Sequence, residues 1–241
     1  MIKAVFMDVG GTIVLNRDID FGKALKAVYD LDKREEKIDF ERYIAVFQSL
    51  YRISFDSVRK ISSEVRIDDF LESLNEICEI KTGLSKDELQ WFFQCNLLDD
   101  VLIEEVKPFL EYAKSKKYPI FCVSNSCMDG KTIARELKEY KVLSYFEEVI
   151  SSADVLFRKP RKEIFDYTYG KLLKIDPEIK RSEVLFIGDS YECDVIGGMN
   201  AGFTPVWLNY AKKEVKDNSF PFINVGSYQE LIDVLKIMES K

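Results

Sequence analysis

Residues 1–12 have the sequence MIKAVFMDVGGT, which joins a short apolar run to an acidic, glycine-rich turn. The apolar residues at 2–7 stop at Asp8, and Gly10 and Gly11 follow closely. A short apolar run that ends in turn-forming residues is typical of a buried strand in a parallel sheet. Because α/β sheets bind ligands at the carboxyl ends of their strands, Asp8 is a candidate functional residue.

Further apolar runs predict the other strands of this sheet. Three are distinct, at residues 119–123 (PIFCV), 184–187 (VLFI) and 205–208 (PVWL), and two are weaker, at residues 148–150 and 222–225. Helical patterns alternate with them at residues 108–117, 131–140, 162–173 and 227–239, the last beginning with a predicted capping box from Ser227 to Glu230. Strands that alternate with helices indicate the α/β class, with a doubly wound parallel sheet.

Residues 17–100 break this alternation. Apolar residues recur every three or four positions from Phe40 to Val58 and again from Phe70 to Cys78, and Ser85 with Glu88 forms a capping box before another helical pattern. No strand pattern is visible in this stretch. We therefore expect an all-helical cap domain at 17–100, inserted into a core made of residues 1–16 and 101–241 and lying over the carboxyl edge of the sheet.

Four short motifs lie where strands end or helices begin. They are residues 8–12 (DVGGT), 123–126 (VSNS), 158–160 (RKP) and 187–194 (IGDSYECD). In this order they resemble the motif set of the haloacid dehalogenase (HAD) superfamily: a nucleophilic Asp, a Ser or Thr, a Lys-Pro, and a Gly-Asp-Ser-x-x-x-Asp. The resemblance extends over nearly the whole chain. It implies a Rossmann-type core that carries a helical cap.

Residues 8–12, taken alone, also resemble the first phosphate loop of sugar kinases of the actin/hexokinase class. That fold needs a second phosphate loop and an adenosine site, usually in a longer chain built from two similar halves. The sequence shows neither feature. Lys159-Pro160 and Gly188-Asp189-Ser190 therefore favour the HAD interpretation.

The HAD resemblance implies a role for each motif residue in a hydrolase that acts on a small phosphorylated substrate. Such chemistry requires an aligned nucleophile and compensation of the phosphate charge. The implied catalytic residues are Asp8, which would form an aspartyl phosphate, and Lys159. The implied substrate-binding residues are Thr12, Ser124, Asn125 and Lys159. The implied ligands of Mg²⁺, a cation that prefers oxygen, are Asp8, the carbonyl of Gly10, Asp189 and Asp194.

Gly10 departs from the pattern of HAD phosphatases. Those enzymes carry a second Asp two residues after the nucleophile, which protonates the leaving group and then activates water. The carbonyl of Gly10 can still bind metal, but assistance of about 10²- to 10⁴-fold would be lost. Glu192, Asp18 or a residue of the cap could replace the missing acid.

Three functions therefore remain open, and we expect the first. The first is a phosphatase that lacks this acid or borrows it; without a substitute it should favour aryl or acyl phosphates. The second is other HAD chemistry. Haloacid dehalogenases also lack the second Asp, but they need no Mg²⁺ and typically lack the acid that Asp189 supplies here. Phosphonoacetaldehyde hydrolases also replace the second Asp, but they use a histidine, and this chain contains none. The third is a non-catalytic protein that binds a phosphorylated ligand.

Composition excludes several other classes of function. The chain contains no histidine, so Ser-His or Cys-His hydrolysis and His-ligated zinc are excluded. A net charge of −7 argues against binding to nucleic acid. No apolar run is long enough to span a bilayer and no signal-peptide pattern is present, so we expect a cytoplasmic protein without a membrane partner. The sequence does not indicate the oligomeric state.

Overall fold

The computed structural model describes residues 1–214 and 220–240, and it confirms the predicted α/β class. Six strands form one sheet in the order β5-β4-β1-β6-β7-β8, and every neighbouring pair is parallel. Their bounds are β1 (Ala4–Met7), β4 (Ile120–Ser124), β5 (Glu148–Ser151), β6 (Val184–Gly188), β7 (Thr204–Leu208) and β8 (Ile223–Val225). Each overlaps a predicted strand. β1 lies between β4 and β6 because Val5 pairs with both Ile120 and Leu185.

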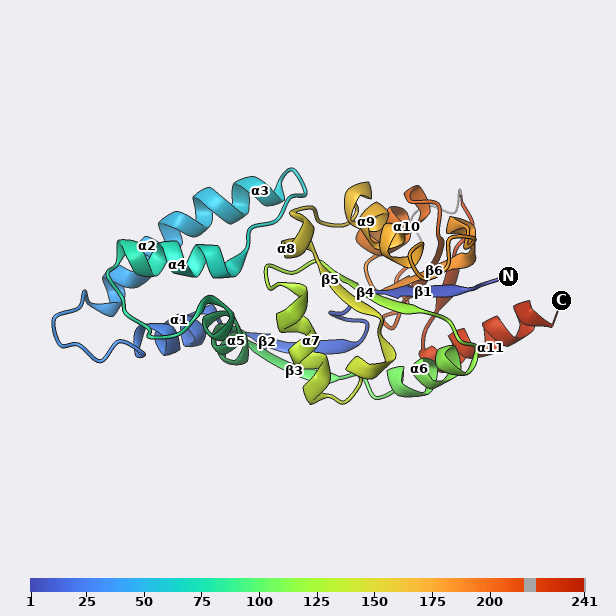
Figure 1. The fold of residues 1–241 in the computed structure, drawn as a ribbon, viewed down its shortest axis with the longest axis horizontal. Helices are drawn as coiled ribbons and strands as arrows, with labels where there is room; N and C mark the ends of the chain where they lie inside the picture. The colour runs from blue at the N-terminus through green and yellow to red at the C-terminus, as the bar shows by residue number, and fades with distance from the viewer. Residues whose placement is uncertain (215–219, 241) are drawn as a thin grey trace.

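Helices cover both faces of the sheet (Figure 1). One side carries α9 (Lys162–Leu172) and α10 (Gly197–Asn200), and the other carries α6 (Val106–Ser115), α7 (Gly130–Glu139) and α11 (Tyr228–Glu239). Phe6 of β1 packs in a cluster with Phe165 of α9, whereas Val5 belongs to the cluster that contains Phe109 and Tyr228. Adjacent residues of a strand face opposite sides, so a continuous apolar run is what a sheet covered on both faces requires.

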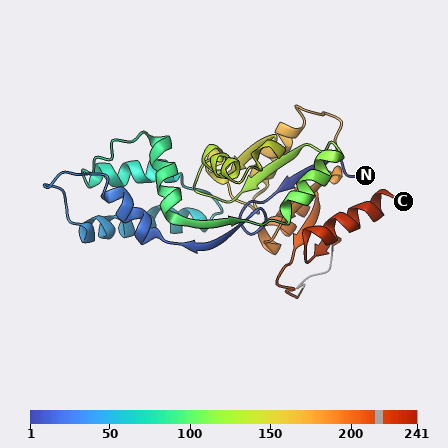
Figure 2. The same cartoon turned by 90° about the horizontal axis from the view of Figure 1, so that it is seen from below.

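A second group of helices lies beyond the carboxyl ends of the strands, and we call it the helical lobe (Figures 1 and 2). It comprises α1 (Phe21–Tyr29), α2 (Phe40–Tyr51), η1 (Arg52–Asp56), α3 (Ser57–Arg59), α4 (Ile67–Ile77) and α5 (Lys86–Leu97). The aromatic residues that predicted these helices form the interior of the lobe. Phe47 meets Phe70 edge-on at 5.6 Å between ring centroids, and Tyr51 stacks on Phe55 at 4.7 Å. None of the described helices is both long enough and apolar enough to cross a bilayer.

The prediction that residues 17–100 contain no strand is wrong. β2 (Val14–Ile19) and β3 (Leu98–Leu102) form an antiparallel ribbon that enters this range from both ends and connects the sheet to the lobe (Figure 2). All residues of β2 after Val14 are exposed, so the strand lacks the apolar alternation that identifies a half-buried strand. Its partner lies about 80 residues away in the sequence, and the register shifts between Asn16 and Asp18.

One of the two predicted capping boxes is complete. At α5, the side chain of Ser85 accepts a hydrogen bond from the backbone N–H of Glu88, and the side chain of Glu88 accepts one from the backbone N–H of Ser85. At α11, the Oγ of Ser227 accepts from the N–H of Glu230 at 3.2 Å, but the carboxylate of Glu230 accepts from Gly226 instead of Ser227. The second half of that predicted box is therefore wrong, because the carboxylate of Glu230 is taken up by the N–H of Gly226.

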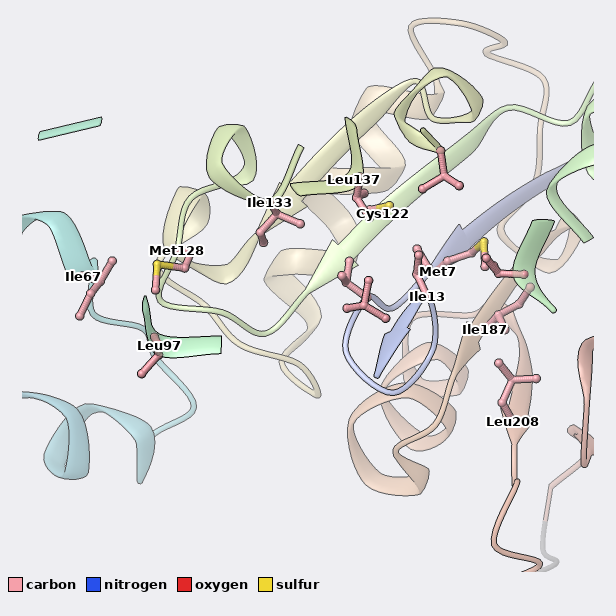
Figure 3. Packing of buried hydrophobic residues seen from close by; sticks show 14 of the residues in the cluster. Met7, Ile13, Ile67, Leu97, Cys122, Met128, Ile133, Leu137, Ile187 and Leu208 are labelled. Carbon is pink, nitrogen blue, oxygen red and sulfur yellow. The ribbon is translucent and has the colours of Figure 1, made fainter. Parts of the chain in front are cut away.

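Buried apolar side chains form a continuous cluster from the sheet into the lobe (Figure 3). It includes Met7 and Ile187 in the sheet, Met128 in the loop after β4, and Ile67 and Leu97 in the lobe. Because burial of apolar surface drives packing, this cluster attaches the lobe to the loop after β4. The lobe consequently lies over the edge of the sheet where the predicted motifs end.

Candidate active site

The carboxyl ends of three adjacent strands bring the predicted motifs together. Asp8 directly follows β1, Ser124 ends β4 and Asp189 directly follows β6. A cavity of about 570 Å³ opens at this edge between the sheet and the lobe. The predicted residues that line it are Asp8, Gly10, Ser124, Asn125, Lys159, Asp189 and Asp194.

Lys159 lies at the centre of the charged groups in this cavity. Its Nζ is 2.6 Å from Oδ1 of Asp8 and 2.8 Å from Oδ1 of Asp194. The side chain is buried, which by itself would lower the pKa of the amine. The carboxylates of Asp194 and Asp8 outweigh that effect and raise the pKa of Lys159 above its usual value. Lys159 therefore stays charged and bridges the two acids.

Three of the acids that line the cavity are crowded together. Carboxylate oxygens of Asp8, Asp189 and Asp194 all lie within 4.8 Å of one another. Burial, together with the charge of Asp8, raises the pKa of Asp189 to about 6. Burial also raises the pKa of Asp194, with Asp8 acting in the same direction and Lys159 opposing. Clustered carboxylate oxygens are the donor set that hard divalent cations prefer, so these residues fit a Mg²⁺ ion.

Asn125 has contacts that differ from the predicted one with substrate. Its Nδ2 donates to the carbonyl of Lys159 at 2.9 Å, and its Oδ1 accepts from the N–H of Lys159 at 2.7 Å. These two bonds fix the backbone of Lys159 beside β4, although Asn125 also lines the cavity. Asn125 thus positions the backbone of Lys159. The sequence around Asn125 resembles that of an ordinary turn, so this contact could not be predicted from it.

Thr12 is the predicted site residue that the structure does not bring to the cavity. Its side chain is fully buried, and its Oγ1 has no hydrogen-bond partner among the described residues. Its carbonyl accepts from the hydroxyl of Tyr228 at 2.8 Å, which ties the loop after β1 to α11. The side chain of Thr12 is therefore not placed to contact a substrate in the cavity.

Sequence reasoning missed the cavity residues that come from the lobe and from the loop before Lys159. Phe21, Tyr51 and Arg59 line the cavity from the lobe, and Arg158 lines it from the core. Arg158 also pairs with the buried carboxylate of Glu64 in the lobe. Arg158 could have been found from the sequence, because it directly precedes Lys159 in the motif at residues 158–160. The lobe residues could not, because they follow an ordinary helical pattern in which residues that line a cavity look the same as residues of the core.

Comparison with known proteins identifies the family. A family model for haloacid dehalogenase-like hydrolases matches residues 2–202, which include every motif described above. The chain belongs to this family. It is a hydrolase with the Rossmann-like HAD fold, as the order of its motifs predicted.

Curated relatives of this HAD hydrolase include several phosphatases. Human N-acylneuraminate-9-phosphatase is 24% identical over an alignment that covers 100% of this chain and 96% of the relative. The putative pyrophosphatase PpaX of Clostridium perfringens is 27% identical, with full coverage of both chains. The pyrimidine 5'-nucleotidase YjjG of Escherichia coli is 38% identical over 91 residues, which span 38% of this chain and only 39% of that protein.

Solved structures share the fold of this HAD hydrolase at low sequence identity. A HAD phosphatase from Thermococcus onnurineus has a TM-score of 0.63 at 24% identity and covers 97% of this chain and 98% of its own. A 2-haloacid dehalogenase from Pseudomonas syringae has a TM-score of 0.65 at 18% identity and covers 99% and 100%. Since a phosphatase and a dehalogenase both share this architecture, the fold alone does not choose between their chemistries.

The two adjacent glycines after Asp8 should respond differently to substitution by alanine. At Gly10 the backbone lies outside the left-handed region, and a Cβ would meet only Oδ1 of the exposed Asn16, at 3.2 Å. At Gly11, φ is +73° and a Cβ would lie 2.4 Å from Oδ2 of Asp189. We expect Gly10→Ala to change the free energy of unfolding by less than about 1 kcal/mol. Gly11→Ala should lower it by about 2 kcal/mol or more and displace Asp189.

Urea unfolding of the two variants measures this difference. Equal midpoints for Gly10→Ala and Gly11→Ala would contradict the account of the loop after β1, because only Gly11 combines a positive φ with close approach to a carboxylate.

Proposed function

We propose that this HAD hydrolase is a Mg²⁺-dependent phosphatase that acts on a small phosphorylated metabolite through an aspartyl phosphate. The observation that carries the proposal is the group of Asp8, Asp189 and Asp194 around the ammonium of Lys159. Haloacid dehalogenases need no Mg²⁺ and typically lack the acid that Asp189 supplies here. The phosphatases among the full-length relatives support the same choice.

In the proposed reaction, Asp8 attacks phosphorus and releases the alcohol. Lys159 holds Oδ1 of Asp8 at 2.6 Å, which fixes the orientation of the carboxylate and keeps positive charge next to the incoming phosphate. Ser124, at the end of β4, would donate its hydroxyl to a phosphate oxygen. Water then attacks phosphorus, releases phosphate and restores Asp8.

The metal of the proposed enzyme would be held by Asp8, the carbonyl of Gly10, Asp189 and Asp194. When bound, Mg²⁺ supplies positive charge that offsets the oxygens of the phosphoryl group. A related HAD hydrolase, YfnB of Bacillus subtilis, has been solved bound to magnesium, with a TM-score of 0.55 at 22% identity. The acidic cluster described above is this chain's own support for the assignment.

We also propose that residues 17–100 act as a cap domain on a core of residues 1–16 and 101–241. Phe21, Tyr51 and Arg59 of the lobe line the same cavity as Asp8. A substrate whose phosphate lies at Asp8 would therefore place the rest of its structure against the lobe. The cap would also limit the substrate to a small molecule, because the cavity it covers is of the size that metabolites fill.

Replacement of Asp8 tests the proposed nucleophile. Asp8→Asn keeps the size of the side chain but removes the nucleophilic charge, so hydrolysis of 4-nitrophenyl phosphate should fall below detection. Asp18→Asn is the matched control, because Asp18 lies on the exposed ribbon and does not line the cavity. Phosphate release by Asp8→Asn at the rate of the control would disprove the assignment. Halide release from a 2-haloacid without added Mg²⁺ would favour a dehalogenase instead.

The pH dependence of metal binding tests the proposed ligand Asp189. The pKa of Asp189 is raised to about 6, so the carboxyl binds a proton as pH falls through this value, and Mg²⁺ must displace it. We expect the affinity for Mg²⁺ to fall at least roughly tenfold for each pH unit below about 6, and more steeply where Asp194, a proposed ligand whose pKa is also raised, holds a proton too. Titration calorimetry at several pH values measures this, and an affinity unchanged down to about pH 5 would exclude Asp189 as a ligand.

A further inference from the structure

The space where other HAD phosphatases carry their second Asp is filled here from the ribbon. A Cβ built on Gly10 would lie 3.2 Å from Oδ1 of Asn16, so the amide of Asn16 lies where a side chain of residue 10 would point. The Nδ2 of the same amide donates to Oδ1 of Asp100 on β3 at 2.5 Å. The space beside Gly10 is therefore not empty. It holds the side-chain amide of Asn16, which is hydrogen-bonded to the carboxyl group of Asp100.

Asp100 in turn belongs to a pair of carboxyl groups. Its side chain is hydrogen-bonded to that of Glu136 on α7, and both residues line the same cavity as Asp8. A hydrogen bond between two carboxyl groups requires that one of them carries a proton. Burial, together with Asp100, raises the pKa of Glu136 to about 8. The pair therefore holds a proton at neutral pH and can release it.

Donors from three elements hold this pair in place. Asn16 of β2 donates to Asp100, and the buried Gln94 of α5 donates its Nε2 to Oε2 of Glu136 at 2.7 Å. The hydroxyl of Tyr140, which follows α7, donates to the carbonyl of Asp100 at 2.6 Å. The other charged or titratable groups near the pair or its immediate neighbours are Arg17, Asp99, Cys95, Arg135 and Glu139.

Two residues that the sequence offered as substitutes do not lie in the cavity. Asp18 is on the exposed part of β2 and bonds to the N–H of Ile19, and Glu192 is exposed on η4 (Tyr191–Ile196). Neither lines the cavity. Among the acids that do line it, Asp8, Asp189 and Asp194 are occupied with Lys159 and with one another. Among the residues that the structure describes, Asp100 and Glu136 are the two that remain.

We propose that Asp100 and Glu136 share the proton that the leaving group takes up, and that Asn16 occupies the place of the acid missing at Gly10. The proposal rests on the phosphatase function above. As the bond from Asp8 to phosphorus forms, the bond from phosphorus to the leaving oxygen breaks and that oxygen keeps the electron pair. It takes a proton from a water molecule at Oδ1 of Asn16, and the pair restores that proton. The second step is the same for every substrate and does not involve the pair: the water that attacks phosphorus releases its proton to solvent, and the pair regains its own proton from solvent.

Leaving-group dependence tests this proposal. The probes are 4-nitrophenyl phosphate, whose leaving group needs no proton, and benzyl phosphate, which has a similar shape but leaves as an alkoxide unless it is protonated. The wild-type enzyme should hydrolyse both. Glu136→Gln and Asp100→Asn should each lower kcat for benzyl phosphate on the order of 10²-fold, and for 4-nitrophenyl phosphate by less than about threefold. Glu139→Gln, an exposed acid on the same helix that does not line the cavity, should change neither.

The pH profile gives a second readout that a structural role would not produce. For the wild-type enzyme, kcat for benzyl phosphate should fall above about pH 8, where Glu136 loses its proton, and this limb should be absent from the 4-nitrophenyl phosphate profile. Equal losses of kcat on the two substrates in Glu136→Gln and Asp100→Asn would overturn the proposal. So would a fall of kcat for benzyl phosphate above about pH 8 that persists in both variants. So would a wild-type enzyme that hydrolyses only 4-nitrophenyl phosphate, and that result would leave the phosphatase function intact. Failure to hydrolyse either ester would instead overturn the phosphatase function itself.

Discussion

The balance of charge around Lys159 is the constraint on which the site depends. Three carboxylates lie within 4.8 Å of one another, and one buried ammonium touches two of them. Fully ionised, the group has two more negative charges than positive ones. Buried charge without compensation is costly, so the site is poised to accept a divalent cation or protons. The pKa values of Asp189 and Asp194 are raised partly by this excess of negative charge, because binding a proton reduces it.

The folded chain holds Lys159 in this position through contacts from both sides. Asn125, just after β4, bonds both backbone groups of Lys159, and the preceding Arg158 pairs with Glu64 of the lobe. Glu64 also accepts from the hydroxyl of Ser152 at 2.7 Å, so lobe and core are joined by polar contacts next to the site. These contacts connect the position of Lys159 to the lobe that we propose contacts the substrate.

Much of the core could be predicted from the sequence, because buried parallel strands are short apolar runs. The motifs at Asp8, Lys159 and Asp189 could be placed together for the same reason, since each follows a strand or begins a helix at one edge of the sheet. The ribbon of β2 and β3 could not, because its strands are largely exposed and their pairing joins distant residues. The contact between Asp100 and Glu136 is likewise invisible in the sequence, because the two residues lie on different elements and neither belongs to a motif.

The proposed reaction requires Asp8 to carry the phosphoryl group during turnover. The most direct measurement is an acid quench of a single turnover with Mg²⁺, followed by mass spectrometry of the proteolytic fragments. We expect the fragment containing Asp8 to gain the mass of one phosphoryl group early in the reaction and to lose it as phosphate is released. Turnover without any phosphorylated fragment, or with the phosphoryl group on a fragment that lacks Asp8, would contradict it.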